Sequence, residues 1–523
     1  MNWHDHLPAF LVMIPLLGAF LTPFAASFGK TARNAFFMLF MALTLVVGML
    51  LCTATFDGGV LVYVMGGENF SLTLPSGMSY PVRILFEIDA FGSLLIFCIS
   101  FAAFAGALFS IQYMDRFSGW KRFMSLYFLM TTGALGMSAT GDLFNFFVFV
   151  EISSIASFGL VAFWRDKPES LEASFKYMLI SQVAAMLLLI AIGSLYGKYN
   201  ALNMGALSSM LRSGTLERVS LALILSVLAF KCGAFPMHTW MPDAYAEAPS
   251  GVTCLLVTVS QASFYGLIRV CYTIFPAVTQ GGTVGWILIA LGCMSMFFGV
   301  MMAVVQHEIK RLMGYHSISQ VGYMLLAMGV GLLALSDGNS NGTVAAYGLT
   351  AMKGGLFHVV NYSFYKGLLF LCAGALYYAT GTRDLDKMGG LARSMPWTAG
   401  MFAVAAAAIS GLPPFNGFVS KWMIYESSFA VHPLLPAVAM ITSVLTLASF
   451  AKVFQAAFLG PSKAKLVAVR EVPYGMLAGM AILTVMTLLL TLFPGWFMDN
   501  FFENAARALL DRQGYIRAVL GGM

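Results

Sequence analysis

Long apolar runs recur along the whole 523-residue chain, and they constrain its fold more than any other feature of the sequence. The hydrocarbon core of a bilayer is about 30 Å thick, so a helix that crosses it needs about 20 mostly apolar residues. About fourteen runs of that length can be read along the sequence. They begin near Leu7, Asn34, Ile88, Phe123, Asp142, Leu171, Val219, Val252, Val284, Gly314, Ala345, Trp397, Leu434 and Met476. The sequence therefore predicts an all-α, polytopic membrane protein.

Composition excludes the main classes of water-soluble protein. Apolar residues make up 59% of the chain and charged residues 10%, against about 45–50% and about 25% in an average soluble domain. The 29 basic and 23 acidic residues are too few to cover the surface of a soluble protein of this length. The net charge of +6 is small and scattered along the chain, so we expect a lipid bilayer around the protein and no nucleic-acid partner.

The seven cysteines all lie in apolar runs and form no CxxC pair. That spacing favours neither a zinc site nor an iron–sulfur cluster. The sequence also lacks the GxxxxGK[ST] and strand–GxGxxG–helix patterns of nucleotide sites. We therefore expect no cofactor, no metal and no catalytic residue, and expect the energy for any transport to come from an ion gradient or from partner subunits.

The uneven distribution of basic residues among the predicted loops predicts the orientation of the chain. Loops after odd-numbered helices contain Lys30, Arg33, Arg116, Lys121, Arg122, Arg165, Lys167, Lys310, Arg311, Arg383, Lys387, Arg393, Lys463, Lys465 and Arg470. Loops after even-numbered helices contain Arg83, Lys198, Arg212 and Arg218. The positive-inside rule then places both termini outside a prokaryotic cytoplasmic (inner) membrane. The segment from Gly58 to Glu87, with its glycines and short β-branched runs, is predicted to be an extracytoplasmic hairpin or interfacial loop.

Seven basic residues remain inside the predicted spans: Lys176, Lys231, Arg269, Lys353, Lys366, Lys421 and Lys452. A charge at the centre of a membrane helix costs at least about 2.5–3.5 kcal/mol, so such residues face a protein interior or a functional site. Arg269 and Lys452 lie near predicted helix ends, where snorkelling to the interface is an alternative. Lys231, Lys366 and Lys421 lie deeper and require a polar interior.

Glu151 is the one carboxylate in the middle of the fifth run, VEISSIASFGLVAF. A buried carboxylate must pair with a cation or take up a proton. Lys176, one helix later, is the expected partner. The pair is interpreted either as a structural salt bridge or as a proton-loading site that switches when the two side chains separate.

Two runs are interrupted by glycine and proline and each contains a lysine. The seventh reads FKCGAFPMHTW around Lys231, and the twelfth reads SGLPPFNGFVSK before Lys421. Proline removes a backbone hydrogen bond, and a broken helix in a membrane lines a cavity or is buried in protein. Such a pair predicts two inverted five-helix repeats with helices 7 and 12 broken. The expected division is 1–122 (helices 1–3 and the hairpin), 123–275 (first repeat), 284–458 (second repeat) and 459–523 (last helix and tail).

Histidines lie between the two interruptions at His238, His316 and His358, and Lys366 follows His358 by eight residues. Histidine titrates near neutral pH, so these groups are interpreted either as a proton relay or as hydrogen-bonding struts between helices. Asn341-Gly342-Thr343 matches a glycosylation sequon, but we expect it to be only a loop.

Five strings resemble the antiporter-like membrane subunits shared by respiratory complex I, Mrp-type cation/proton antiporters and energy-converting membrane hydrogenases. They are VEISSIASFGLVAF, KCGAFPMHTWMPDAYAEAP, HEIKRLMGYHSISQVGYM, LFHVVNYSFYKGLLFL and SGLPPFNGFVSKW, and the resemblance covers residues 90 to 460 approximately. It implies fourteen helices and a proton half-channel built on Glu151 and Lys231. Further family positions match Lys176, His238, His358, Lys366 and Lys421. The early VYVMGG…PVRILFEIDAF segment looks closest to the D-type chain of Mrp antiporters and its counterparts in membrane-bound hydrogenases.

The sequence departs from the family pattern at two positions. Many relatives have a lysine or histidine on the eighth helix where this chain has Ser260 or Gln261, and some have a second histidine where it has Tyr362. Gln261 and Tyr362 are therefore candidate relay residues. Either water replaces the missing titratable group, or the central relay is altered.

The resemblance implies a proton-translocating subunit, with Na⁺/H⁺ antiport as an option, in a hetero-oligomeric complex with other membrane subunits. A peripheral hydrogenase or dehydrogenase arm would make the whole complex, not this chain, the enzyme. Two alternatives stay open. One is a stand-alone secondary transporter of a small solute, and the other is a mainly structural anchor for a redox arm.

Overall fold

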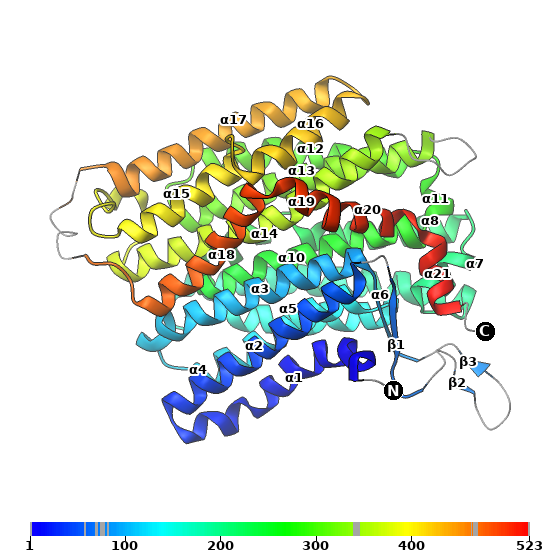
Figure 1. Ribbon diagram of the computed structural model, residues 1–523, viewed down its shortest axis with the longest axis horizontal. Coiled ribbons are helices and arrows are strands. Elements are labelled where there is room, and N and C mark those ends of the chain that lie inside the picture. Colours follow the sequence, from blue (N-terminus) through cyan, green and yellow to red (C-terminus); the bar gives the residue numbers. More distant parts are fainter. Residues whose placement is uncertain are drawn as a thin grey trace.

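Long helices lie side by side in an elongated bundle, and the N- and C-termini lie at the same end of it (Figure 1). The computed structural model describes residues 3–56, 59–67, 72–73, 79–80, 83–337, 346–461, 463 and 469–520. The sequon at Asn341 lies outside these residues.

The helices follow one another with short connections. They are α1 (Leu7–Ala25), α2 (Lys30–Thr55), α3 (Ala90–Tyr113), α4 (Trp120–Ala139), α5 (Leu143–Val161), α6 (Pro168–Tyr199), α7 (Met204–Met210), α8 (Thr215–Cys232), α9 (Trp240–Glu247), α10 (Ser250–Arg269), α11 (Pro276–Thr279), α12 (Thr283–Val304), α13 (Ile309–Asp337), α14 (Ala346–Thr380), α15 (Pro396–Ser410), α16 (Asn416–Phe429), α17 (Leu434–Phe454), α18 (Tyr474–Leu492), α19 (Pro494–Phe497), α20 (Glu503–Leu510) and α21 (Arg512–Leu520).

Eleven helical segments among the described residues are long and apolar enough to cross a membrane. Each of the fourteen predicted runs contains a helix. The three runs that do not match one of these eleven segments contain α4, the pair α8/α9 and the pair α15/α16. The prediction of an all-α, polytopic membrane protein is confirmed. The count of fourteen spans and the inverted symmetry of two repeats stay predictions.

A small β-structure lies at the end of the bundle that contains both termini (Figure 1). Strand β1 (Leu61–Val64) pairs antiparallel with β4 (Leu85–Ile88), and β2 (Leu72–Thr73) pairs with β3 (Ser79–Tyr80). β4 leads directly into α3, and its four residues are buried. The described residues of the segment from Gly58 to Glu87 thus form paired antiparallel strands, and its extracytoplasmic position stays a prediction.

The centre of the bundle is formed by α10 and α14. Every residue of α10 is buried, and α10 packs against α3, α8 and α14. Helices at the periphery, such as α6 and α17, instead expose large apolar side chains, among them Val183, Ile190 and Val444. Such an outward apolar surface is stable in lipid and not in water.

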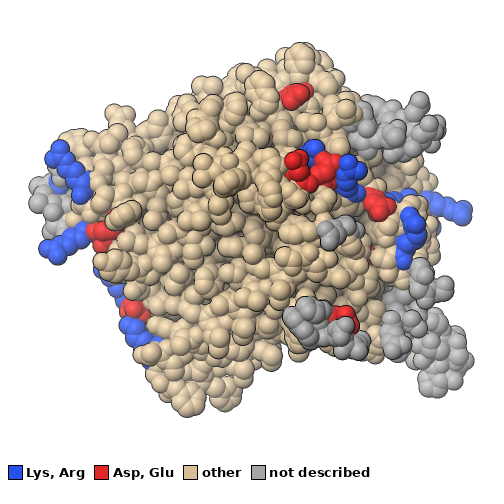
Figure 2. Space-filling model, in the orientation of Figure 1, with Lys and Arg blue, Asp and Glu red and all other residues tan. Residues whose placement is uncertain are grey.

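Charged side chains gather at the two ends of the face seen in Figure 2, and most of the surface between them is uncharged. A mixed patch of acidic and basic side chains lies over the region of α20. There Glu503 of α20 forms ion pairs with Lys353 of α14 at 2.5 Å and with Arg507 at 2.7 Å. Helix α20, which precedes the last helix α21, is thereby tied to one of the central helices.

Two helices are broken where glycine and proline predict it. α8 ends at Cys232 and α9 begins at Trp240, while α15 ends at Ser410 and α16 begins at Asn416. Each first half ends on a glycine with a left-handed backbone, Gly233 (φ +82°) and Gly411 (φ +73°), a conformation that glycine adopts without the penalty of a Cβ atom. The breaks leave helix-terminal carbonyl groups without intrahelical partners.

Candidate functional site

Lys231 joins three helices beside the first break. It lies in the last turn of α8 and only 4% of it is exposed. Its Nζ donates to Ser154 Oγ of α5 at 2.7 Å and to Ser181 Oγ of α6. Two hydroxyl oxygens thus hold the ammonium group in a site without an ion pair to a described residue.

Glu151 lies close to this site on α5. Gln182 Nε2 donates to Glu151 Oε2 at 3.2 Å, and Glu151 Oε1 is buried with no hydrogen-bond partner among the described residues. Ser154 follows Glu151 by three residues, and Gln182 follows Ser181 directly, so Glu151 and Lys231 contact the same turns of α5 and α6. The Glu151 carboxylate is near enough to act on the charge of Lys231.

Lys176 does not pair with Glu151, so this part of the sequence interpretation is corrected. Half of the Lys176 side chain is exposed, and its Nζ lies 2.6 Å from Glu172 and 3.7 Å from Asp243. Glu172 precedes Lys176 by one helical turn, and Asp243 lies on the facing helix α9. Two carboxylates on the accessible rim therefore hold Lys176, and Gln182 is the partner of Glu151.

His238 lies inside the break between α8 and α9. Its ring stacks on Phe235, with 5.2 Å between the ring centres, and its Nδ1 is buried without a hydrogen-bond partner among the described residues. His238, seven residues after Lys231, therefore lies on the non-helical segment between the two helices.

Gln261 and Tyr362 carry unpartnered polar atoms at the centre of the bundle. Gln261 lies on α10, and both polar atoms of its amide are buried without a partner among the described residues, as is the hydroxyl of Tyr362 on α14. The preceding residue, Ser260, is contacted by Tyr245 OH at 3.3 Å. Buried polar groups without partners are uncommon, so packing alone does not explain a glutamine here.

His316 and Lys366 share an aromatic neighbour. His316 Nε2 of α13 lies 2.8 Å from Ser449 Oγ of α17, and its ring centre is 4.8 Å from that of Phe450. Lys366 of α14 is fully buried, has no hydrogen-bond partner among the described residues, and has its Nζ 5.9 Å from the centre of the Phe450 ring. Phe450 therefore lies beside both titratable groups.

His358 is the centre of a hydrogen-bonded network between α13, α14 and α16. Its Nδ1 lies 3.1 Å from Ser420 Oγ, and its Nε2 lies 3.1 Å from Gln320 Oε1. Tyr365 OH donates to the same Gln320 oxygen at 3.2 Å. The Tyr323 ring centre lies 5.4 Å from that of His358 and 4.8 Å from Lys421 Nζ, so this ring connects the network to the lysine of the second break.

Lys421 is 1% exposed and is held by the broken helix itself. Its Nζ donates to the carbonyl oxygen of Ile409 at 2.9 Å and to Ser443 Oγ at 3.0 Å. The centre of the Tyr323 ring lies 4.8 Å from the same nitrogen. Carbonyl, hydroxyl and aromatic groups thus surround the ammonium group.

The structure brings the predicted residues together in three groups. Glu151 and Lys231 lie at the first break with His238, and Lys421 lies at the second break with His358. His316 and Lys366 meet at Phe450, and α10 with Gln261 packs against both α8 and α14. Lys176 lies apart from these groups on the rim.

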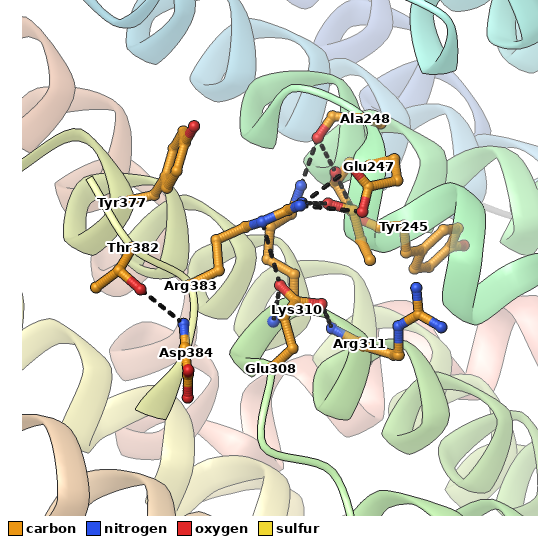
Figure 3. A network of polar contacts seen from close by, with 12 residues as sticks. Tyr245, Glu247, Ala248, Glu308, Lys310, Arg311, Tyr377, Thr382, Arg383 and Asp384 are labelled. Carbon is orange, nitrogen blue, oxygen red and sulfur yellow. Dashed lines mark hydrogen bonds and ion pairs between the residues drawn. The ribbon is translucent and has the colours of Figure 1, made fainter. Parts of the chain in front are cut away.

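Sequence reasoning misses a network of charges that we call the clasp, formed by Glu247, Glu308, Lys310 and Arg383 (Figure 3). Arg383 lies 3.0 Å from Glu247 Oε1 and 3.5 Å from Glu308 Oε1. Lys310, 3% exposed, donates to the carbonyl oxygen of Ala248. The clasp joins α9 to the start of α13 and the segment after α14.

Burial raises the pKa of the Glu308 carboxyl above its ordinary value, and the charge of Arg383 opposes that change. The sequence pattern assigns Lys310 and Arg383 only to loops that set the orientation of the chain. The charged HEIKR string at the very start of an apolar run is the signal in the sequence for a buried network.

A buried ion pair lies at the opposite end of α10. Arg269 Nη2 lies 2.6 Å from Asp89 Oδ1, with the two side chains 1% and 3% exposed. Arg269 therefore does not extend to the membrane interface, which is the alternative expected from its position near a helix end. Lys452, also near a helix end, donates to the carbonyl oxygens of Val304 and Gln306 at 3.0 and 3.2 Å and so caps the end of α12.

The fold and the site define a multi-pass membrane protein with buried titratable residues at two broken helices. Residues 140–446 match the family model described as NADH:quinone oxidoreductase/Mrp antiporter, TM, and the chain belongs to that family. This confirms the resemblance that the five sequence strings indicate.

Two curated relatives match almost the whole chain. The D-type chain of the Na⁺/H⁺ antiporter of Alkalihalophilus pseudofirmus is 31% identical over 98% of this chain and 99% of the relative. The N-type chain of the NADH-quinone oxidoreductase of Desulforudis audaxviator is 31% identical over 96% of this chain and 98% of the relative. Among solved structures, a protein of the Mrp complex from a Dietzia species superposes with a TM-score of 0.87 at 26% identity, and both proteins are covered completely.

Proposed function

We propose that this chain is the proton-translocating subunit of a multi-subunit membrane complex, an Mrp-type antiporter or a complex I-like or hydrogenase complex. The observation that carries the proposal is the pair of buried lysines, Lys231 and Lys421, each held by uncharged oxygens at a broken helix. A lysine without a counter-ion in a protein interior can lose and regain its proton within a narrow energy range.

In the first half, a proton arrives near Glu151 and is held at Lys231. Ser154 and Ser181 accept hydrogen bonds from the ammonium group and leave Glu151 free to change its own protonation. Lys176 takes part from the rim: when its contact with Asp243 opens, its charge can approach α5 and lower the energy of an ionised Glu151. The electrostatic coupling is strong because the interior screens charge poorly.

In the second half, the proton passes from the region of Gln261 and Tyr362 to Lys366 and His316. From there His358, which contacts Ser420, leads to Lys421 at the second break. His238 connects the first break to the same interior. Histidine can accept a proton at one ring nitrogen and release one from the other, which suits it to such a line.

The partners expected for this subunit are other membrane subunits, because its structural neighbours come from multi-subunit membrane complexes. Protons are the proposed cargo, and Na⁺ is included because a relative is named as part of a Na⁺/H⁺ antiporter. Both termini are proposed to lie outside the cytoplasmic membrane, with the clasp at the cytoplasmic ends of its helices. A peripheral dehydrogenase or hydrogenase arm is part of the proposal only for the complex I-like or hydrogenase alternative.

One observation favours a second function, a mainly structural anchor. Gln261 does not titrate in the accessible pH range, so a line that depends on proton transfer at that point would be interrupted. A stand-alone solute transporter is less favoured because the buried polar residues lie in separate groups and not around one pocket.

The test is proton flux into vesicles that contain the intact complex, followed with a pH-sensitive dye. Replacing Lys231 or Glu151 by alanine should abolish flux while the complex still assembles. Lys452→Ala is the matched control, because Lys452 is a basic residue inside the bundle that only caps α12. Wild-type flux in the Lys231→Ala variant would exclude the proposed function.

A further inference from the structure

Glu87 is a second buried carboxylate beside the Asp89–Arg269 ion pair. It lies on β4, is 0% exposed, and neither of its carboxylate oxygens has a hydrogen-bond partner among the described residues. Asp89 caps the N-terminus of α3, where its Oδ1 accepts from the backbone N–H of Gly92 at 2.8 Å, and its Oδ2 also lacks a partner in the described part of the chain.

The cluster formed by Glu87, Asp89 and Arg269 contains two carboxyl groups and one guanidinium, so with all three ionised it has one excess negative charge. Arg269 Nη2 lies 2.6 Å from Asp89, and the other described hydrogen bonds of its guanidinium go to Tyr265 OH and Thr273 Oγ1. Neither Glu87 oxygen accepts a well-formed hydrogen bond from a described residue, and the groups nearest to its charge are the Tyr515 hydroxyl and the Arg269 guanidinium, which already neutralises Asp89. An ionised carboxylate enclosed in this way is strongly unfavourable, so the cluster is balanced when Glu87 carries one proton.

The titratable groups nearest to Glu87 come from four helices at this end of the bundle. They are Asp89 at the N-cap of α3, Asp142 at the N-cap of α5, Tyr265 and Arg269 on α10, and Tyr515 on α21. The Arg269 guanidinium lies 4.8 Å from the centre of the Tyr515 ring, so the C-terminal helix covers the cluster.

The cluster also approaches the start of α5. A Cβ atom on Gly141 would lie 2.8 Å from Glu87 Oε2, so only glycine allows the carboxyl to come this close to the backbone. The next residue, Asp142, is 6% exposed and its Oδ1 accepts from Asn145 N–H at 2.7 Å. Nine residues further along α5, a distance of about 13 Å, is Glu151.

We propose that Glu87 is a proton-binding carboxyl, and that it exchanges protons between the end of the bundle that contains both termini and the first group of the site, by way of Asp142. The transport part of this proposal rests on the proposed function. In each exchange the Glu87 carboxyl gives up one proton, which the Asp142 carboxylate or a water molecule accepts, and no bond other than O–H changes. Burial raises the pKa of Glu87 well above its ordinary value and that of Asp142 to about 6.

The protonation of Glu87 is tested by infrared spectroscopy of the full-length protein in membranes at neutral pH. We expect wild type to show the C=O absorption of a protonated carboxyl, Glu87→Gln to lose it, and Glu87→Asp to retain it at a shifted position. Glu217→Gln is the matched control, because Glu217 is buried but ionised by Lys198 Nζ at 2.5 Å. An unchanged absorption in Glu87→Gln would overturn the proposal, and the Glu87→Asp spectrum decides it if the glutamine variant does not fold.

Proton flux in the intact complex tests the transport part. Glu87→Gln should reduce flux by about tenfold or more, because proton transfer by a positioned group contributes about 10²–10⁴-fold. Loss of the absorption with wild-type flux would overturn the exchange role. Retained flux in Lys231→Ala would refute the proposed function instead, and the infrared result would still decide whether Glu87 binds a proton.

Discussion

Lys421 Nζ lies 2.9 Å from the carbonyl oxygen of Ile409, in the last turn of the helix that the second break interrupts. The break thus creates the acceptor that holds the lysine. At the first break a carbonyl in the last turn of α8, that of Phe230, accepts from Trp240 Nε1 at 2.9 Å, and Lys231 is held by serines of neighbouring helices. The two breaks have similar backbones but hold their lysines differently, so we expect the two halves to respond differently to substitution.

Removing the hydroxyls that hold Lys231 should impair proton flux without removing any charge. In the Ser154→Ala/Ser181→Ala double variant the ammonium loses both acceptors, and an unsatisfied buried polar group costs about 1–3 kcal/mol, more when charged. We expect flux to fall by about tenfold or more. Ser226→Ala is the control, because Ser226 lies on α8 and donates only to its own helix. Equal flux in both variants would contradict a role for the hydroxyls.

The clasp should contribute to stability as a coupled unit. Arg383→Ala removes the cation that bonds both Glu247 and Glu308 and leaves Lys310 as the remaining positive charge of the clasp. Breaking a fully buried ion pair costs roughly 3–5 kcal/mol, and because Arg383 and Glu308 are 22% and 26% exposed we expect a smaller loss, of about 1–3 kcal/mol. Thermal unfolding of the purified protein measures the loss. The exposed Arg393→Ala should change stability by at most about 0.5 kcal/mol. In a Glu247→Gln/Glu308→Gln background, Arg383→Ala should cost much less, and an undiminished cost would show that Arg383 acts elsewhere.

Asp142 should make stability depend on pH. Burial raises its folded pKa from 3.8 to about 6, so the folded protein binds more protons than the unfolded chain between these values. Its stabilising contribution is complete below about pH 4 and is lost as pH rises through about 6, by an amount on the order of 3 kcal/mol. Asp142→Asn retains an N-cap side chain for α5 and should remove this pH dependence. A pH profile of unfolding that is identical in wild type and Asp142→Asn would contradict the assignment.

Gln261 offers a test that separates transport from stability. Gln261→Leu removes two buried polar atoms that have no described partner, so stability should stay unchanged or rise. If protons pass this position, flux should fall by about tenfold or more. Ser263→Ala, on the same helix with a hydroxyl bonded to the Val259 carbonyl, is the control. Full flux in Gln261→Leu would place the route elsewhere.

Local sequence signals are enough to predict much of the fold. Apolar runs indicate the long helices, and glycine followed by proline indicates the breaks after Lys231 and before Lys421, because φ angles and missing N–H groups are properties of a few consecutive residues. The hairpin before α3 can be predicted for the same reason. The partners of buried charges cannot be predicted in this way.

The partners of Lys176 and Arg269 show why. Lys176 lies one turn from Glu172 and opposite Asp243, so helix rotation and packing, and not the order of helices along the chain, direct it away from Glu151. Arg269 pairs with Asp89, a residue 180 positions earlier, because α3 and α10 pack together. Such pairings depend on tertiary structure, which one sequence without its relatives does not specify.

Proton flux in the Lys421→Ala variant tests the central claim most directly, because it asks whether the route continues through the second half of the chain. We expect the Lys421→Ala complex to assemble and to show no proton flux. Flux at the wild-type rate in an assembled Lys421→Ala complex would contradict a route through both broken helices and would favour a mainly structural role for this half.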